Sequence, residues 1–125
     1  MELKLYKCMH CGNIIEMVED HGVPVVCCGE PMKLMQAGST DAAQEKHVPV
    51  VKVEGNKVHA CVGEVTHPMG DDHHIAFIIL VTDKGVYRRE LPHTGKPEAV
   101  FCLHDEKPQA VFEYCNLHGL WMKEL

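Results

Sequence analysis

Four cysteines near the N-terminus most limit how this chain can fold. Cys8 and Cys11 form a C-x-x-C pair, whereas Cys27 and Cys28 are adjacent. The apolar runs around them are only a few residues long, which is too short to build a hydrophobic core unaided. We therefore expect residues 1–36 to form a small module of short strands and tight turns that a metal ion stabilises.

The numbers of cysteines and histidines indicate metal chemistry. The chain has seven cysteines, and an odd number fits a disulfide framework poorly. The N-terminal sequence lacks the basic and apolar regions of a secretory signal, so we expect a cytoplasmic protein with reduced cysteines. The ten histidines add imidazole, which binds first-row transition metals well.

Charge and hydropathy exclude two other classes of protein. The net charge is −6 with neutral histidines, which argues against a nucleic-acid binder that neutralises phosphates. No stretch approaches the roughly eighteen consecutive apolar residues of a membrane span, so we expect no membrane partner. Hydrophobic residues make up 46% of the chain, which is ordinary for a globular protein.

Beyond the cysteine-rich module, the pattern indicates a second domain made of strands. Residues 37–46 are small and polar and predict a linker, with a helical turn capped by Ser39, Thr40 or Asp41. Residues 47–125 predict an antiparallel, immunoglobulin-like β-sandwich of about seven strands, so the whole chain is expected to be all-β. The predicted strands cover residues 48–53, 57–65, 75–81, 86–91, 99–103, 110–114 and 120–122.

The cysteines of the N-terminal module form the first candidate metal site. Together Cys8, Cys11, Cys27 and Cys28 offer four thiolates, a soft tetrahedral set that suits zinc or iron. Ligand chemistry alone does not choose between these metals, and a closed zinc knuckle that only stabilises the fold is the simpler alternative. Adjacent ligands cannot both easily adopt relaxed tetrahedral angles, so we expect a distorted site.

Three short stretches in the second domain form the second candidate site. Cys115 and His118 are three residues apart, so one tight turn can direct both side chains toward one ion. His67 and His73 flank a polar loop that can fold to bring both imidazoles together. The stretches are Glu45-Lys46-His47-Val48-Pro49, His67-Pro68-Met69 with His73, and Cys115-Asn116-Leu117-His118-Gly119.

Taken together, these motifs resemble a known family over nearly the whole chain. Residues 6–16 and 26–32 resemble desulforedoxin, the N-terminal module of desulfoferrodoxin, and this resemblance implies an Fe(Cys)4 centre. The three stretches, the last of them continued through Leu120-Trp121, resemble the catalytic domain of superoxide reductases of the neelaredoxin and desulfoferrodoxin family. This likeness implies a second iron that reduces superoxide to hydrogen peroxide, with four equatorial imidazoles, an axial thiolate and one open position. Its implied ligands are His47, His67, His73, His118 and, as the axial thiolate, Cys115.

The resemblance also implies roles for neighbouring residues and for partners. The resemblance implies that Glu45 can occupy the sixth iron position in the oxidised resting state. Lys46 carries the only local positive charge beside the implied ligand His47, so we expect it to attract superoxide and to stabilise developing peroxide charge; an ordinary solvated lysine is the alternative. A rubredoxin-like protein is the implied electron donor, and a homodimer is the implied assembly.

The sequence departs from the family pattern at a few positions. His74 follows His73 where an aromatic residue is more usual, and the six-residue step from His67 selects His73 as the ligand. Cys61 and Cys102 are additional cysteines in apolar runs, and we expect both to be core residues rather than ligands.

Three other functions remain open on the sequence alone. Both sites could only relay electrons, although an open coordination position argues against this for the second site. The chain could instead be a zinc-binding module without superoxide chemistry. A dismutase must oxidise superoxide as well as reduce it, whereas a thiolate-ligated iron with an external reductant favours reduction.

Overall fold

The computed structural model describes residues 2–40 and 42–125, and these residues form two compact units, Glu2–Gln36 and Ala37–Leu125. Apart from one four-residue helix, the regular structure consists of antiparallel strands. The predicted all-β class is therefore confirmed. Within the described ranges, no helix is long and apolar enough to cross a membrane.

The N-terminal unit consists of very short strands. Three of them form a sheet in the order β2-β1-β5, and the other two form a hairpin, β3-β4. Its buried apolar residues are few, namely Leu5, Cys8 and Met32, as expected for a fold that depends on a metal. The strands are β1 (Leu5–Lys7), β2 (Ile14–Glu16), β3 (Val26–Cys27), β4 (Glu30–Pro31) and β5 (Lys33–Leu34).

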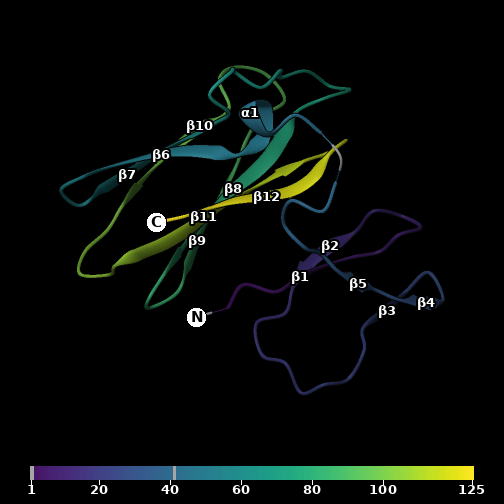
Figure 1. Cartoon of the computed structure of the whole chain (residues 1–125). Helices are drawn as coiled ribbons and strands as arrows, with labels where there is room; N and C mark the ends of the chain where they lie inside the picture. Colours follow the sequence, from purple (N-terminus) through teal and green to yellow (C-terminus); the bar gives the residue numbers. More distant parts are fainter. Residues whose placement is uncertain (1, 41) are drawn as a thin grey trace. The chain divides into compact units, whose positions relative to one another are not determined.

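The second unit is a seven-stranded sandwich that follows the short helix α1 (Gln44–His47). One sheet has the order β10-β7-β6 and the other has the order β12-β11-β8-β9 (Figure 1). Each predicted strand segment has its counterpart in the structure. The strands are β6 (Pro49–Glu54), β7 (Lys57–Val62), β8 (Ile75–Thr82), β9 (Val86–Glu90), β10 (Glu98–Cys102), β11 (Pro108–Cys115) and β12 (Gly119–Glu124).

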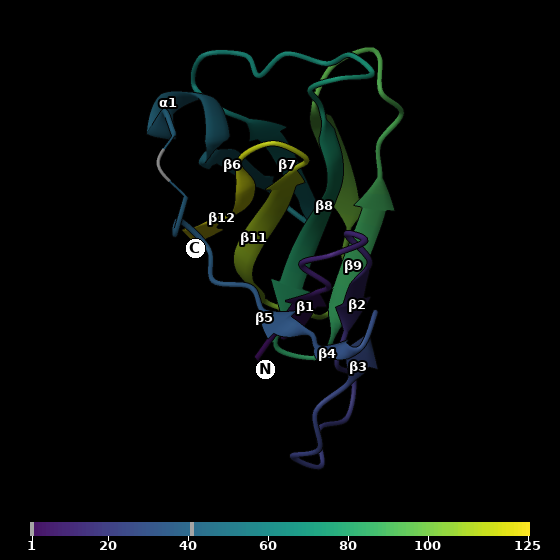
Figure 2. The same ribbon diagram turned by 90° about the vertical axis from the view of Figure 1, so that its right-hand side faces the viewer.

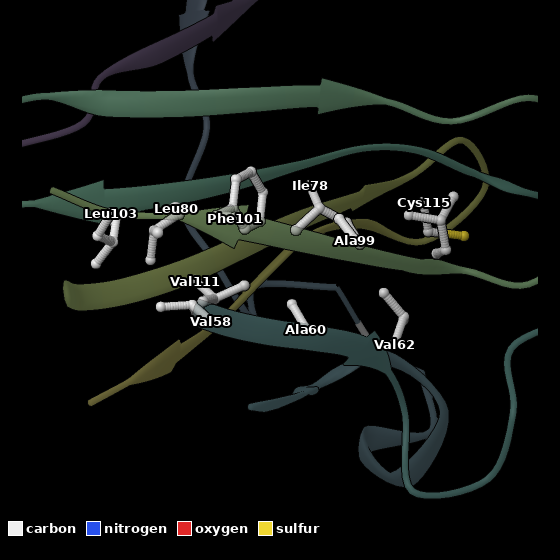
Figure 3. Close-up of a cluster of buried hydrophobic side chains, with 11 residues drawn as sticks. Val58, Ala60, Val62, Ile78, Leu80, Ala99, Phe101, Leu103, Val111 and Cys115 are labelled. Carbon is white, nitrogen blue, oxygen red and sulfur yellow. The ribbon is translucent and has the colours of Figure 1, made fainter. Parts of the chain in front are cut away.

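The core lies between the two sheets and is built by alternation along each strand. From β7, the inward side chains are Val58, Ala60 and Val62, and they meet Ile78 and Leu80 of β8. Figure 3 shows these side chains facing one another, with the sulfur of Cys115 at one end of the cluster. The hydrophobic core therefore leads directly to one of the candidate ligands.

That end of the sandwich is where the loops with candidate ligands converge. Helix α1, the connection from β7 to β8 and the turn from β11 to β12 all lie at one end of the unit (Figure 2). The turn between β11 and β12 is short because Cys115 pairs with Gly119 across it. The sandwich therefore brings segments that are far apart in the sequence to one place.

Two predictions about the sandwich are wrong in detail. Cys102 is exposed and Cys61 is only partly buried. The residues next to each cysteine point into the core instead, namely Phe101 in β10 and Ala60 and Val62 in β7. Alternation along a strand therefore places both cysteines on the outer face of this sheet.

The predicted helical turn forms, but neither Ser39 nor Thr40 caps it. The N-cap of α1 is Ala43, which makes no side-chain capping hydrogen bond. The third predicted cap, Asp41, lies outside the described residues.

Glu113 is an acidic side chain on the inward face of β11. Val111 and Cys115, two residues away on either side, belong to the core cluster, and Glu113 is 0% exposed. Among the described residues, neither of its carboxylate oxygens has a hydrogen-bond partner. Burial raises the pKa of Glu113 to about 9 from an ordinary 4.5, so the folded protein holds this carboxyl group in its neutral form at pH 7.

We expect Glu113 to make stability fall as pH rises. Between the unfolded pKa near 4.5 and the folded pKa of about 9, the folded state binds a proton that the unfolded state has lost. The destabilisation at pH 7 is on the order of 3 kcal/mol, and Glu113→Gln should remove it. Thermal unfolding of both proteins from pH 5 to pH 9 measures this difference.

Glu124→Gln, on the exposed end of β12, is the control and should keep the pH dependence of the parent. Parallel pH profiles for the parent and Glu113→Gln would show that Glu113 is not held as a neutral acid.

Candidate metal centres

The four N-terminal cysteines converge on one point. All four are free thiols, and their sulfur atoms lie within 4.8 Å of one another. Sulfurs around a tetrahedral ion with metal–sulfur distances of about 2.3 Å lie about 3.8 Å apart. The separation of 3.6 Å between Cys11 Sγ and Cys27 Sγ fits this geometry. The first predicted ligand set is therefore brought together as a tetrahedral site would require.

Two turns with left-handed backbone position these thiols. In the knuckle, Gly12 has a φ of 86° and donates its backbone N–H to Cys8 O at 3.0 Å. Cys28 and Gly29 have φ values of 53° and 77° and form the two-residue loop of the β3-β4 hairpin. Two such residues are typical of a type I′ turn, and a non-glycine residue there is strained. This strained turn directs two adjacent cysteines toward one point.

The protonation of the thiols indicates that the cluster needs a cation. Backbone N–H groups of Cys11 and His10 lower the pKa of Cys8 to about 6. Hydrogen bonds with the thiols of Cys11 and Cys8 raise the pKa of Cys28 to about 12. Without a positive ion, the cluster therefore holds one thiolate readily but not four. A bound metal would allow all four to ionise.

The second cluster is a closed ring of four imidazoles. His47 contacts His67 and His118, with ring centroids 4.8 Å apart in both pairs. His73 completes the ring, at 4.5 Å from His67 and 5.1 Å from His118. Neighbouring rings meet edge to face, with interplanar angles of 73–86°. This arrangement lets four imidazoles offer nitrogen donors to one ion.

The inner nitrogens of His47 and His67 are free to point inward because their outer nitrogens contact backbone carbonyls. His47 Nδ1 lies 2.7 Å from Ala43 O, and His67 Nδ1 lies 2.7 Å from Pro68 O. Among the described residues, the buried Nε2 atoms of His67 and His73 have no hydrogen-bond partner. His47 Nε2 and His118 Nδ1 are 3.1 Å apart, close to the roughly 3.0 Å between adjacent nitrogens of a square set at 2.1 Å from a metal.

The sulfur of Cys115 completes the cluster. It lies 3.8 Å from His118 Nδ1, and the donor atoms of all five residues lie within 4.8 Å of one another. Burial raises the pKa of the Cys115 thiol, while the backbone N–H groups of His118 and Leu117 lower it. These two N–H groups are therefore placed to stabilise a thiolate once a cation offsets the burial.

Burial favours the neutral, metal-binding form of three of the four histidines. Burial lowers the pKa of His67 to about 4 and also lowers the pKa values of His47 and His73. At neutral pH these rings therefore carry lone pairs rather than protons on their inner nitrogens. The predicted second ligand set thus fits a transition metal in both geometry and protonation.

The predicted charged residues lie on α1, next to the ring. The charge of Lys46 lowers the pKa values of His47 and His73, although less than burial does, so the ammonium group acts on the ring. Glu45 is outside the group of five donors and lines a cavity of about 540 Å³ with Glu64 and Lys123. In this structure Glu45 is therefore near the ring without joining it.

The backbone of α1 is fixed by the segment that follows β7. Val65 N donates to Glu45 O at 3.0 Å, and Gly63 has a φ of 84°. A Cβ at Gly63 would lie 2.7 Å from Lys46 O and 2.8 Å from Glu45 O. Only glycine therefore permits this close approach.

Sequence reasoning did not assign a role to two aromatic contacts around the site. Trp121 stacks on His47 at 5.1 Å and donates its indole N–H to His118 O at 3.0 Å, so it supports two rings at once. His74 is excluded from the ring of donors, because its Nδ1 lies 2.9 Å from Gly70 O and its ring stacks on His93 at 3.7 Å. Trp121 is recognisable in the sequence only as part of the C-terminal motif, and nothing in the sequence signals the stack on His93.

Comparison with known proteins gives a consistent result. The desulfoferrodoxin family model matches residues 39–124, and the model of the desulfoferrodoxin N-terminal domain matches residues 1–35. Desulfoferrodoxin from Nitratidesulfovibrio vulgaris is 49% identical over 123 residues, covering 98% of this chain and 97% of the relative. The superoxide reductase of Thermococcus kodakarensis is 34% identical over 105 residues, covering 70% of this chain and 91% of the relative.

A solved structure extends the likeness to three dimensions. The crystal structure of the superoxide reductase from Treponema pallidum has a TM-score of 0.83 and 39% sequence identity, and covers 99% of this chain and 100% of that one. The matches span both units of the chain, including the two clusters of metal-binding side chains. This chain belongs to the desulfoferrodoxin family.

Proposed function

We propose that this chain is a superoxide reductase whose catalytic iron is held by five side chains at one end of the sandwich. The observation that carries the proposal is the closed ring of four imidazoles with one cysteine sulfur beside it. The two clusters correspond to the two iron sites of the family. The proposed ligands are His47, His67, His73, His118 and Cys115 for the catalytic iron, and Cys8, Cys11, Cys27 and Cys28 for the other.

The reaction consumes one superoxide, one electron and two protons and yields one hydrogen peroxide. Bound iron supplies the electron. These five side chains would hold the iron and could leave room for superoxide as a further ligand, which would distinguish a reactive site from a closed structural one. The thiolate of Cys115 is the one sulfur among nitrogen donors, and a thiolate ligand increases electron density at a metal.

Lys46 is proposed to bring the anion to the site. The chain carries a net charge of −6, which repels superoxide at long range. A cation beside the ring is therefore needed to raise the local concentration of the anion at the site. The effect of Lys46 on the pKa values of His47 and His73 supports its proximity. Glu45 lies on the same helix as Lys46 and His47 and would supply a carboxylate to oxidised iron, since ferric iron is a hard acid.

Lys46→Ile should lower the second-order rate constant for the reaction of the reduced protein with superoxide by about tenfold or more. The physical reason is the loss of local attraction and of charge stabilisation for developing peroxide. The rate is measured by pulse radiolysis at several salt concentrations. The parent rate should fall with added salt, whereas the rate of the variant should stay level or rise as the remaining negative charge is screened.

Lys52→Ile is the matched control. Lys52 is exposed on β6 and pairs with Glu54 at 2.8 Å, so its loss changes the net charge equally without touching the ring. Equal rates and salt slopes for the parent and Lys46→Ile would remove Lys46 from the mechanism.

Electrons are proposed to come from a rubredoxin-like donor. The reaction needs an external reductant, and the exposure of Cys11 and Cys28 makes the Fe(Cys)4 centre accessible to a redox partner. Reduction of the loaded protein by a purified rubredoxin, followed by stopped flow, tests this assignment. No faster reduction than with an unrelated one-electron donor would contradict it.

A homodimer is the proposed assembly. The N-terminal unit exposes several apolar side chains for its size, including Val18 at 87%, Val23 at 72% and Val26 at 61%. Burial of these side chains against a second copy would stabilise a unit that has little core of its own. Sedimentation equilibrium should give a mass of two chains, and a monomer at micromolar concentration would contradict this assembly.

The cytoplasm is the proposed location of the protein. None of the seven cysteines is in a disulfide, and five of them are proposed metal ligands, a use of cysteine that is typical of a reducing compartment.

A further inference from the structure

His73 differs from two other members of the imidazole ring in how its position is fixed. The outer nitrogens of His47 and His67 contact backbone carbonyls at 2.7 Å, and such contacts orient a ligand ring. Among the described residues, the inner Nε2 of His73 has no hydrogen-bond partner, and the backbone carbonyl of His73 accepts a hydrogen bond from Gly70 N at 2.9 Å. Contacts of the backbone around His73 therefore hold this ligand in place.

Asn116 makes that interaction through the backbone on both sides of His73. Its Oδ1 accepts a hydrogen bond from His74 N at 2.9 Å. Its Nδ2 donates to Asp72 O at 3.0 Å, and its backbone N–H donates to His74 O at 3.2 Å. One side chain thus bridges the residues immediately before and after the ligand.

Asn116 also follows Cys115 directly in the sequence. The same residue therefore joins the turn that carries the sulfur ligand to the loop that carries His73. A shift of either segment would have to break hydrogen bonds made by the half-buried Asn116 amide. The backbone groups left without partners would then destabilise the folded protein.

The stack outside this clamp braces the same loop. The His74 ring lies against His93 at 3.7 Å, and His93 Nδ1 lies 3.3 Å from Asp71 Oδ1. These contacts lie at the surface, because the His93 side chain is 51% exposed. Gly70 N donates to His73 O at 2.9 Å within the same loop, whereas Asn116 ties this loop to the turn that carries Cys115.

We propose that Asn116 is the positioning residue that fixes His73 relative to Cys115 and thereby sets iron retention and ligand geometry at the catalytic site. This inference rests on the proposed function only for the identity of the metal. The carbonyls of Ala43 and Pro68 orient the rings of His47 and His67. The side-chain amide of Asn116 has the corresponding role for His73. Loss of such outer contacts typically weakens metal binding by roughly 10–100-fold.

The test uses the full chain loaded with iron at both sites. A chelator is added, and loss of each iron is followed by electron paramagnetic resonance of the oxidised protein, with the Fe(Cys)4 signal as the internal reference. Asn116→Ala should release the catalytic iron at least tenfold faster and change the shape of its signal. Release from the Fe(Cys)4 centre should stay at the parent rate.

Two further variants make the result decisive. Asn116→Asp keeps the acceptor for His74 N but loses the donor to Asp72 O, so it should give an intermediate release rate. Asn56→Ala, in the exposed turn between β6 and β7, should match the parent. If Asn116→Ala does not yield folded protein, the aspartate variant decides the question.

A merely structural role for Asn116 predicts a lower unfolding temperature with an unchanged catalytic iron signal. That outcome, or release within twofold of the parent in both Asn116 variants, would overturn the proposal. Superoxide takes no part in this test. A failure of the parent to reduce superoxide would therefore count against the proposed function and not against the role of Asn116.

Discussion

Burial of neutral imidazoles around a common centre is the interaction on which the catalytic end of the sandwich depends. Burial lowers the pKa of His67 to about 4, so its ring is held without a proton. The Nε2 atoms of His67 and His73 lie buried without partners in the described structure, at a cost that a bound cation removes. The sandwich stabilises this arrangement because its core continues to Cys115, whose sulfur lies at the edge of the ring. Metal binding and folding of this end are therefore coupled.

The side chains of the two candidate metal centres are brought together in different ways. In the N-terminal unit, two local turns direct the thiols, and one of them places Cys28 in a left-handed conformation with a φ of 53°. In the sandwich, ligands come from a helix, a long connection and a hairpin turn, and the sheets bring these segments together. The first centre therefore depends on local backbone conformation, whereas the second depends on long-range strand pairing and on contacts such as those of Trp121 and Asn116.

Much of this arrangement is predictable from the sequence, because strand alternation and ligand motifs are local signals. The strands appear as periodic apolar runs, and the family resemblance points to all nine side chains that the structure gathers into the two clusters. Alternation also explains the error at Cys102, since an apolar run does not reveal which face of a strand points inward. The neutral acid at Glu113 and the clamp at Asn116 depend on the pairing of β11 with β8 and on a loop more than forty residues away, so no local pattern could reveal them.

The most direct test of the account is the product yield when the reduced protein meets superoxide in a pulse-radiolysis or stopped-flow experiment. The iron centre supplies one electron per superoxide, so each superoxide consumed by reduced protein should give one hydrogen peroxide and no dioxygen. One oxidised catalytic iron should appear for each peroxide formed. A yield of one peroxide and one dioxygen for every two superoxide molecules, with the iron returning to its starting state, would show dismutation and contradict the account.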